Sequence, residues 1–280
     1  MRRMSSERIP EGVGRTAIGV ARVRALESAR PDRLFDDPYA AAFVAASGAA
    51  TRERTGEPSP GLRDMVRHLT IRTRFFDDHL LDAARSGCTQ VVLPGAGLDT
   101  RAFRLDWPPG TRFFELDTAP VLAFKERVLA DLGAVPAGPR ATLAVDLRED
   151  WADELTGAGF DPELPGAWLL EGLLVYLESA EVATLLDTVT GLAAPGSRLA
   201  LTHGRGRSEH PDRIPAAPES DPGLAAVYEL WRGGLAEDPV AWLDRHGWQA
   251  ERHDRAELAR EYGRGADYLT PQRSFVTARR

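Results

Sequence analysis

Glycines and carboxylates follow four short apolar segments of the chain. Gly95 and Gly97 come directly after QVVLP, Asp117 ends TRFFELD, Asp146 follows ATLAV, and Glu171 follows GAWLL. Glycine allows positive φ angles and a close approach of the backbone to a ligand. A carboxylate about 20 residues after such a glycine turn is placed to accept hydrogen bonds from ribose hydroxyls. The pattern therefore predicts a site for an adenosine-type ligand.

A dinucleotide and S-adenosylmethionine make different demands on the residues after the glycines. Dinucleotide-binding loops usually read G-x-G-x-x-G and place the pyrophosphate at a helix N-terminus. Here Thr100 stands at the third glycine position, and Asp99 brings a negative charge that would repel a pyrophosphate. S-adenosylmethionine carries no phosphate, so the sequence favours it as the cofactor over NAD. Asp117 and Asp146 could instead cap the following helices, and both roles can coexist.

The segments around these residues alternate between expected strands and helices from Thr89 onward. This alternation predicts an α/β fold with a mostly parallel sheet, helices on both faces and an antiparallel final pair of strands. In such a sheet the ligand binds beyond the carboxyl ends of the strands. A helix is expected over 179–193, with Ser179 as its N-cap. Seven strands are expected within QVVLPGAG, TRFFELD, ATLAVDL, GAWLLEGLLVYL, SRLALTHG, GWQAERHD and RSFVTAR.

Two further regions complete the expected organisation. Residues 15–85 show helical periodicity, so residues 1–85 are expected to form an N-terminal helical cap on a core over 86–280. The segment RGRSEHPDRIPAAPESDPG is polar and proline-rich, and a connection of this length is typical of a lid or binding loop. We therefore expect a lid insertion at about 204–240.

Composition and charge narrow the class of protein. The chain has 280 residues, 43% of them hydrophobic, and a net charge of −7. An acidic chain without a basic run does not favour nucleic acid as a partner. Cys88 is the only cysteine, which excludes an internal disulfide, and no apolar stretch reaches the roughly 20 residues of a membrane span. The N-terminus lacks the apolar segment of a secretory signal, so we expect a cytoplasmic protein. No HxH or HExxH sequence occurs, so we expect no metal at the site.

Several longer motifs occur together in one order along the chain. They are TAIGVARVRALES, LFDDPYAAAFV, RTRFFDDHLL, VVLPGAGLDTRAFRL, ELDTAPVLAFK, VDLRED and LLEGLLVYL. From about Arg15 to Gly204 the chain resembles the leucine carboxyl methyltransferase-like family of class I S-adenosylmethionine-dependent O-methyltransferases, which has many actinobacterial members. The resemblance implies a Rossmann-like seven-stranded sheet of order 3-2-1-4-5-7-6, with strand 7 antiparallel. It also implies S-adenosyl-L-methionine as the cofactor and a small molecule as the methyl acceptor.

The resemblance assigns residues to the methionyl end of the cofactor. Arg72, in IRTR, matches the family arginine that pairs with the methionyl carboxylate. Arg74 is the alternative, because the motif offers both arginines. Glu171 would lie beside the methionyl amino group.

The nucleoside end of the cofactor is assigned in the same way. Gly95 and Gly97 would pass under the cofactor, and Asp117 would hold the ribose. Asp146 and Leu147 would flank the adenine, where the acid could accept a hydrogen bond from the exocyclic amine.

The acceptor decides whether a catalytic base is needed. A carboxylate is ionised at neutral pH and needs none, so the enzyme would contribute alignment and exclusion of water. Arg148 and Tyr176 match the family residues that would steer an acceptor carboxylate, although Arg148 could also be a solvated arginine and Tyr176 a core aromatic. A phenol or alcohol would need a base, and His203 and His210 are the candidates. The resemblance favours the carboxylate, although related enzymes of secondary metabolism also methylate hydroxyls.

Two other classes of function stay open at this point. One is a nicotinamide-dependent oxidoreductase, which Thr100 and Asp99 disfavour. The other is a cofactor-binding protein that has lost catalysis, which the four strand-end acids and glycines disfavour. The aromatic residues Trp231 and Trp242 are expected mostly in the core, with some of this C-terminal aromatic group beside the acceptor.

Overall fold

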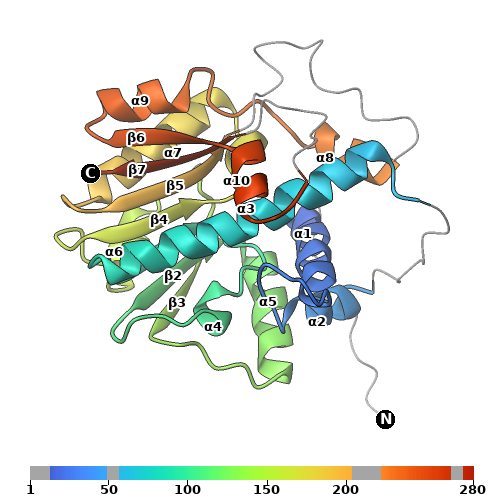
Figure 1. Cartoon of the computed structure of the whole chain (residues 1–280). Helices are drawn as coiled ribbons and strands as arrows, with labels where there is room; N and C mark the ends of the chain where they lie inside the picture. The colour runs from blue at the N-terminus through green and yellow to red at the C-terminus, as the bar shows by residue number, and fades with distance from the viewer. Residues whose placement is uncertain (1–12, 49–56, 204–221, 266–273) are drawn as a thin grey trace.

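The computed structural model describes residues 13–48, 57–203, 222–265 and 274–280 (Figure 1). His210 and the first half of the expected lid, residues 204–221, lie outside this part of the chain. None of the helices it describes has the length and apolar character needed to span a bilayer.

A seven-stranded sheet forms the centre of the molecule (Figure 1). Its strand order is β3-β2-β1-β4-β5-β7-β6. The first five strands in this order pair in parallel, and β7 is antiparallel to both of its neighbours. Order and direction confirm the predicted fold class. The strands are β1 (Gln90–Pro94), β2 (Arg112–Asp117), β3 (Arg140–Ala144), β4 (Gly166–Leu170), β5 (Arg198–His203), β6 (Gln249–Asp254) and β7 (Ser274–Arg279).

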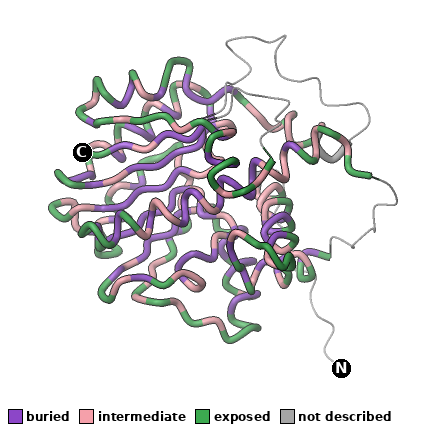
Figure 2. Tube along the Cα trace, viewed as in Figure 1, coloured by how far each residue is buried: buried purple, intermediate pink, exposed green. Residues whose placement is uncertain are grey.

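Helices cover both faces of the sheet because side chains alternate between the faces along each strand. Val91 contributes to one hydrophobic core with α3 and α10, and Val92 to another with α7 and α9. The inner strands β2, β1, β4, β5 and β7 are buried along most of their length, whereas the edge strands β3 and β6 and the outer sides of the helices are largely exposed or half-buried (Figure 2). The described helices are α1 (Val13–Ser28), α2 (Ala40–Ala46), α3 (Pro60–Arg85), α4 (Arg101–Arg104), α5 (Ala119–Asp131), α6 (Ala152–Gly157), the 3-10 helix η1 (Leu174–Tyr176), α7 (Ser179–Leu192), α8 (Pro222–Glu229), α9 (Pro239–Arg245) and α10 (Arg255–Glu261).

The N-terminal helices pack in two different places. α1 and α2 share a small core with α5, in which Ile18, Phe43 and Phe124 are buried. α3 belongs to the core on one face of the sheet, where Ile71 and Phe76 are fully buried. The division into a cap over 1–85 and a core over 86–280 stays a prediction, and the last helix of the expected cap shares its core with the sheet.

The start of α7 corrects one local prediction. Ser179 is not the N-cap, because Glu178 occupies that position. Glu178 and Glu181 form a reciprocal capping box, in which the Glu178 amide donates to Glu181 Oε2 at 2.8 Å. The Ser179 hydroxyl instead accepts a hydrogen bond from the amide of Ala236 at 3.0 Å, so it ties α7 to the segment before α9.

Candidate active site

A cavity of about 580 Å³ lies at the carboxyl ends of the parallel strands. All five strand-end residues that the sequence singled out line it: Gly95, Gly97, Asp117, Asp146 and Glu171. Residues of α1, α3 and η1, and of the segment that follows α8, form its other walls. The sheet order brings these strand ends together because β1, β2, β3 and β4 are consecutive neighbours in space.

Asp117 holds the glycine turn in place. The Gly97 amide donates to Asp117 Oδ2 at 2.7 Å, and the Thr118 amide donates to Oδ1 at 2.7 Å. Gly95 and Gly97 have φ angles of +68° and +50°, which glycine adopts without strain. Burial raises the pKa of Asp117, although these amides oppose the shift. Because Thr118 is the N-cap of α5, Asp117 lies outside the helix it was considered to cap.

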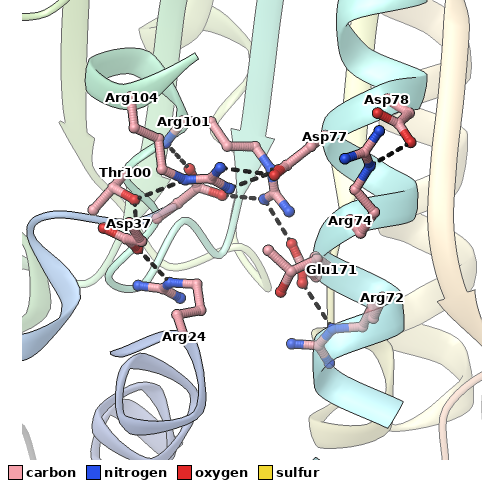
Figure 3. Close-up of polar contacts among 12 residues, drawn as sticks. Arg24, Asp37, Arg72, Arg74, Asp77, Asp78, Thr100, Arg101, Arg104 and Glu171 are labelled. Carbon is pink, nitrogen blue, oxygen red and sulfur yellow. Dashed lines mark hydrogen bonds and ion pairs between the residues drawn. The ribbon is translucent and has the colours of Figure 1, made fainter. Parts of the chain in front are cut away.

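Arg101 lies at the centre of a buried cluster of ion pairs (Figure 3). Its Nε donates to Asp77 at 2.7 Å, and its Nη1 donates to both Asp99 and Glu171, the latter at 2.6 Å. Arg72 Nε donates to the second carboxylate oxygen of Glu171 at 2.7 Å. Each carboxylate oxygen of Glu171 therefore accepts a hydrogen bond from an arginine, and Nη1 of Arg101 bridges Asp99 and Glu171.

The arginines of this cluster keep the carboxylates ionised. Burial alone would raise the pKa of Glu171, but Arg101 and Arg72 outweigh it and hold that pKa below its ordinary value. At Asp99 burial is outweighed mainly by Arg101, and the pKa falls to about 2. Both carboxylates line the cavity, so an ammonium group of a ligand would meet negative charge that is already in place.

A second set of contacts extends the cluster to α1 (Figure 3). Asp77 accepts two hydrogen bonds from Arg104, at 2.7 and 2.6 Å. Arg104 Nε donates to Thr100 Oγ1 at 3.2 Å, and this hydroxyl donates to Asp37 at 2.8 Å. Arg24 of α1 donates to the same Asp37 carboxylate at 2.7 Å. The geometry of the cavity therefore depends on helices that are far apart in the sequence.

Arg72 and Arg74, which the sequence left as alternatives, have different surroundings. Arg72 lines the cavity, and a Cβ at Gly172 would approach its Nη1 to 2.9 Å. Arg74 donates to Asp78 and to the carbonyl oxygen of Leu34, each at 2.8 Å, and lies outside the cavity (Figure 3). The structure places Arg72, and not Arg74, beside the carboxylate at the end of β4.

The loop after β3 forms another wall of the cavity. Asp146, Leu147 and Arg148 all line it. Asp146 accepts hydrogen bonds from the backbone amide and the guanidinium of Arg148, and these bonds lower its pKa to about 2. The Arg148 side chain is 55% exposed, so it lies at the solvent side of the cavity. Asp146 precedes Trp151, the N-cap of α6, by five residues and does not cap that helix.

The residues predicted to act on the acceptor share the same cavity. Tyr176 lines it, and its Oη donates to Thr16 Oγ1 at 3.4 Å. His203 is buried at the end of β5 and also lines it. The catalytic roles of Tyr176, His203 and Arg148 stay predictions, and His210 lies outside the described residues.

Other cavity residues were missed or only partly predicted by the sequence. Ala17 on α1 comes within 3.4 Å of the position a Cβ of Gly97 would take, so α1 covers the glycine turn. Arg101 follows Asp99 by two residues in GAGLDTR, and this spacing could have indicated that the two side chains pair. Its other partners, Asp77 and Glu171, are 24 and 70 residues away in the sequence. Trp231 lines the cavity, as some of the aromatic group was expected to, whereas Trp242 belongs to the core.

The described residues contain no group of three or more His, Cys, Asp and Glu side chains that could hold a metal ion. The absence of a metal requirement stays a prediction.

Comparison with known proteins identifies the family. The model of the leucine carboxyl methyltransferases matches residues 17–190, more than half of the chain. The chain belongs to this family. A relative from Parafrankia sp. (strain EAN1pec), named as an S-adenosyl-L-methionine-dependent methyltransferase, is 49% identical over 279 residues, which cover 98% of this chain and 89% of the relative. A relative of the same description from Streptomyces coelicolor is 47% identical over 268 residues. The matched region covers 91% of this chain and 89% of the relative.

Solved structures support the fold of this leucine carboxyl methyltransferase family member. A methyltransferase from Thermobifida fusca YX has a TM-score of 0.55 at 19% identity, with 93% of this chain and 94% of that chain covered. A DUF574 family protein from Streptomyces avermitilis has a TM-score of 0.56 at 16% identity, with 93% and 96% covered. At these identities the likeness concerns the fold alone.

The protein is therefore an S-adenosylmethionine-dependent methyltransferase, and its cavity suits that cofactor. When bound, S-adenosylmethionine supplies a methyl group on a positively charged sulfur. Glu171, Asp99 and Arg72, which belong to one ion-paired cluster at the cavity wall, supply both signs of charge and so suit the ammonium and carboxylate of its methionyl part. Asp117 suits the ribose, as predicted, and the acid at Asp99 disfavours the pyrophosphate of a dinucleotide at the glycine turn.

Proposed function

We propose that this methyltransferase transfers the methyl group to a carboxylate of a small molecule and forms a methyl ester. The observation that carries this proposal is the pairing of three of the cavity's acids with arginines, while Asp117, whose pKa burial raises, is expected to hold the ribose. Glu171, Asp99 and Asp146 each accept hydrogen bonds from guanidinium groups, and the pKa of each lies below its ordinary value. Such carboxylates are weak bases. An acceptor that is already ionised at neutral pH does not need a stronger one.

The family description supports the same acceptor class. It names a carboxyl group for the leucine carboxyl methyltransferases. In this proposal Arg148 and Tyr176 orient the acceptor carboxylate, since both line the cavity. An arginine fork can donate two parallel hydrogen bonds to a carboxylate. The remaining contribution of the chain is to align the acceptor oxygen with the methyl group and to exclude water.

A hydroxyl acceptor is the second candidate, and His203 is the observation that favours it. This histidine is buried at the end of β5 and lines the cavity. A neutral imidazole there could accept the proton of a phenol or alcohol during methyl transfer.

Methyl transfer from labelled S-adenosylmethionine to matched pairs of acids and phenols tests the proposal. A carboxylate acceptor gives an ester that mild base hydrolyses, and its single-turnover rate should be nearly constant between pH 6 and 9 because the acceptor stays ionised. A base-stable ether, formed at a rate that rises through a histidine-like pKa and is lost in His203→Gln, would overturn it. Ligand-free unfolding of His203→Gln checks that the variant folds.

A further inference from the structure

The cavity extends well beyond the residues expected to hold the cofactor. Leu62, Met65, Val66 and Leu69 on α3 line it at positions that precede Arg72 on the same helix face. Leu62 and Arg72 are ten residues apart, which corresponds to about 15 Å along an α-helix. The cavity therefore continues along α3, away from the ion pair that Arg72 makes at the end of β4.

Apolar side chains from two other segments line this part of the cavity. Val20 comes from α1, Val227 from α8, and Trp231 from the turn that follows α8. The Trp231 ring packs edge-on against Tyr228, with ring centroids 4.6 Å apart. Figure 1 shows the first half of α3 extending past the ends of the strands towards α1 and α8. We call this part of the cavity the apolar limb and define it by Leu62, Met65, Val66, Leu69, Val227 and Trp231.

The apolar limb differs from the helix face that packs on the sheet. Ile71, Phe76 and Leu80 of α3 are fully buried in the protein core. Leu62, Met65 and Val66 remain half-buried and face the cavity. An apolar wall in contact with water is unfavourable, and a ligand with an apolar body removes that contact.

We propose that the acceptor of this enzyme is a monocarboxylic acid with an extended aliphatic body, and that the apolar limb binds this body. The inference rests on the proposed function, because it assumes a carboxylate as the reacting group. The acid group would lie at the end of the limb near Tyr176 and His203, which line the cavity where it meets the strand ends. A second carboxylate at the far end of the acceptor would lose its hydration among these apolar side chains, a cost that His68 and Arg232, which also line the cavity, would offset only in part.

A series of straight-chain acids tests the length of the acceptor. Butanoate, hexanoate, octanoate and decanoate are titrated by calorimetry into the full-length enzyme loaded with S-adenosylhomocysteine, so that no methyl transfer occurs. Each methylene buried in the limb should tighten binding about three- to fourfold. Decanedioate, matched to decanoate in length, should bind at least tenfold more weakly than decanoate. An affinity that is independent of chain length, or equal for the diacid, would overturn the proposal.

Two matched substitutions test the place of binding. Val66→Glu adds a charge to the apolar limb and should weaken decanoate at least tenfold while S-adenosylhomocysteine binds as before. Val135→Glu makes the same change at a residue that is 76% exposed outside the cavity, and should leave both affinities unchanged. Val66→Thr serves if Val66→Glu lowers the unfolding temperature. If Val66→Thr bound decanoate as tightly as wild type while affinity still rose with chain length, the aliphatic body of the acceptor would bind outside the apolar limb.

The outcomes separate this inference from the proposed function. Length-dependent binding without ester formation from labelled S-adenosylmethionine would support the apolar limb and contradict the carboxylate acceptor. Esterification of short polar acids, with no gain from chain length, would support the carboxylate acceptor and contradict the role of the limb.

Discussion

At the residue scale, Asp117 connects the glycine turn to the predicted ribose site. Its carboxylate accepts the amides of Gly97 and Thr118, so its removal should affect both the ligand and the ligand-free fold. We expect Asp117→Ala to weaken S-adenosylmethionine by about 1–3 kcal/mol and to destabilise the ligand-free protein by about 1 kcal/mol. Calorimetry and urea unfolding measure the two effects. Unchanged cofactor affinity would show that Asp117 supports only the turn.

The two arginines of the IRTR motif permit a matched pair of substitutions. Arg72 lines the cavity beside Glu171, whereas Arg74 bonds to Asp78 outside it. Arg72→Ala should weaken S-adenosylmethionine at least tenfold but should have little effect on decarboxylated S-adenosylmethionine, which lacks the partner of the guanidinium. Arg74→Ala should leave both affinities near their wild-type values. If Arg72→Ala weakened both ligands equally, Arg72 would not be the residue that binds the methionyl carboxylate.

At the scale of elements, Arg24 ties α1 to the glycine turn. It donates to Asp37 at 2.7 Å and to the carbonyl oxygen of Leu98 at 2.6 Å, and the Asp37 side chain is fully buried. Removal of Arg24 would leave the buried Asp37 charge with hydrogen bonds from Thr100 and backbone amides but without its paired guanidinium, and loss of one member of a buried ion pair is strongly destabilising. We expect Arg24→Gln to destabilise the protein by about 3 kcal/mol and to weaken S-adenosylmethionine, because α1 forms a wall of the cavity.

Urea unfolding and calorimetry measure both effects of Arg24→Gln. Arg22→Gln is the control, since Arg22 is exposed on the same helix and its loss should change stability by less than about 0.5 kcal/mol. If the two variants behaved alike, the contacts of Arg24 would not hold α1 in place.

At the scale of the whole molecule, pH should change stability through the partly buried histidines His79 and His253 before it acts on the carboxylate clusters. Burial, together with Arg198 and His253, lowers the pKa of His79 to about 4. Between pH 6.5 and 4 the unfolded chain takes up a proton at this position and the folded chain does not. Stability is therefore complete above about pH 6.5 and falls as the pH approaches 4. Burial also lowers the pKa of His253, which acts in the same direction.

We expect His79→Gln to reduce this loss of stability by about 2–3 kcal/mol. Urea midpoints at pH 7.5 and pH 4.5 measure it in the variant and the wild type. The pKa of Asp99 lies at about 2 in the folded state and near 4 in the unfolded chain, so its stabilisation disappears only below about pH 4. If wild type and His79→Gln lost the same stability between pH 7.5 and pH 4.5, His79 would not be the source of that loss.

The sequence by itself determined the sheet and the residues at its strand ends. Short apolar runs, the glycines at 95 and 97, and the acids at 117, 146 and 171 are local features, and all five residues line the cavity. The alternation predicted a mostly parallel sheet with an antiparallel final pair of strands, whereas the strand order came from the family resemblance. The N-cap of α7 could not be distinguished, since Glu178 and Ser179 are adjacent and both can cap a helix.

The tertiary structure alone decided which charged side chains meet. Arg72 and Glu171 are 99 residues apart and Arg101 and Glu171 are 70 apart, and only the packing of α3 and α4 at the sheet brings them together. Arg72 and Arg74 have the same side chain and lie two residues apart, so only the direction in which α3 presents them separates the cavity from the outer surface. The apolar limb has the same origin: Met65 and Trp231 belong to ordinary apolar patterns, and α3 and the α8 segment must come together before these residues line one space.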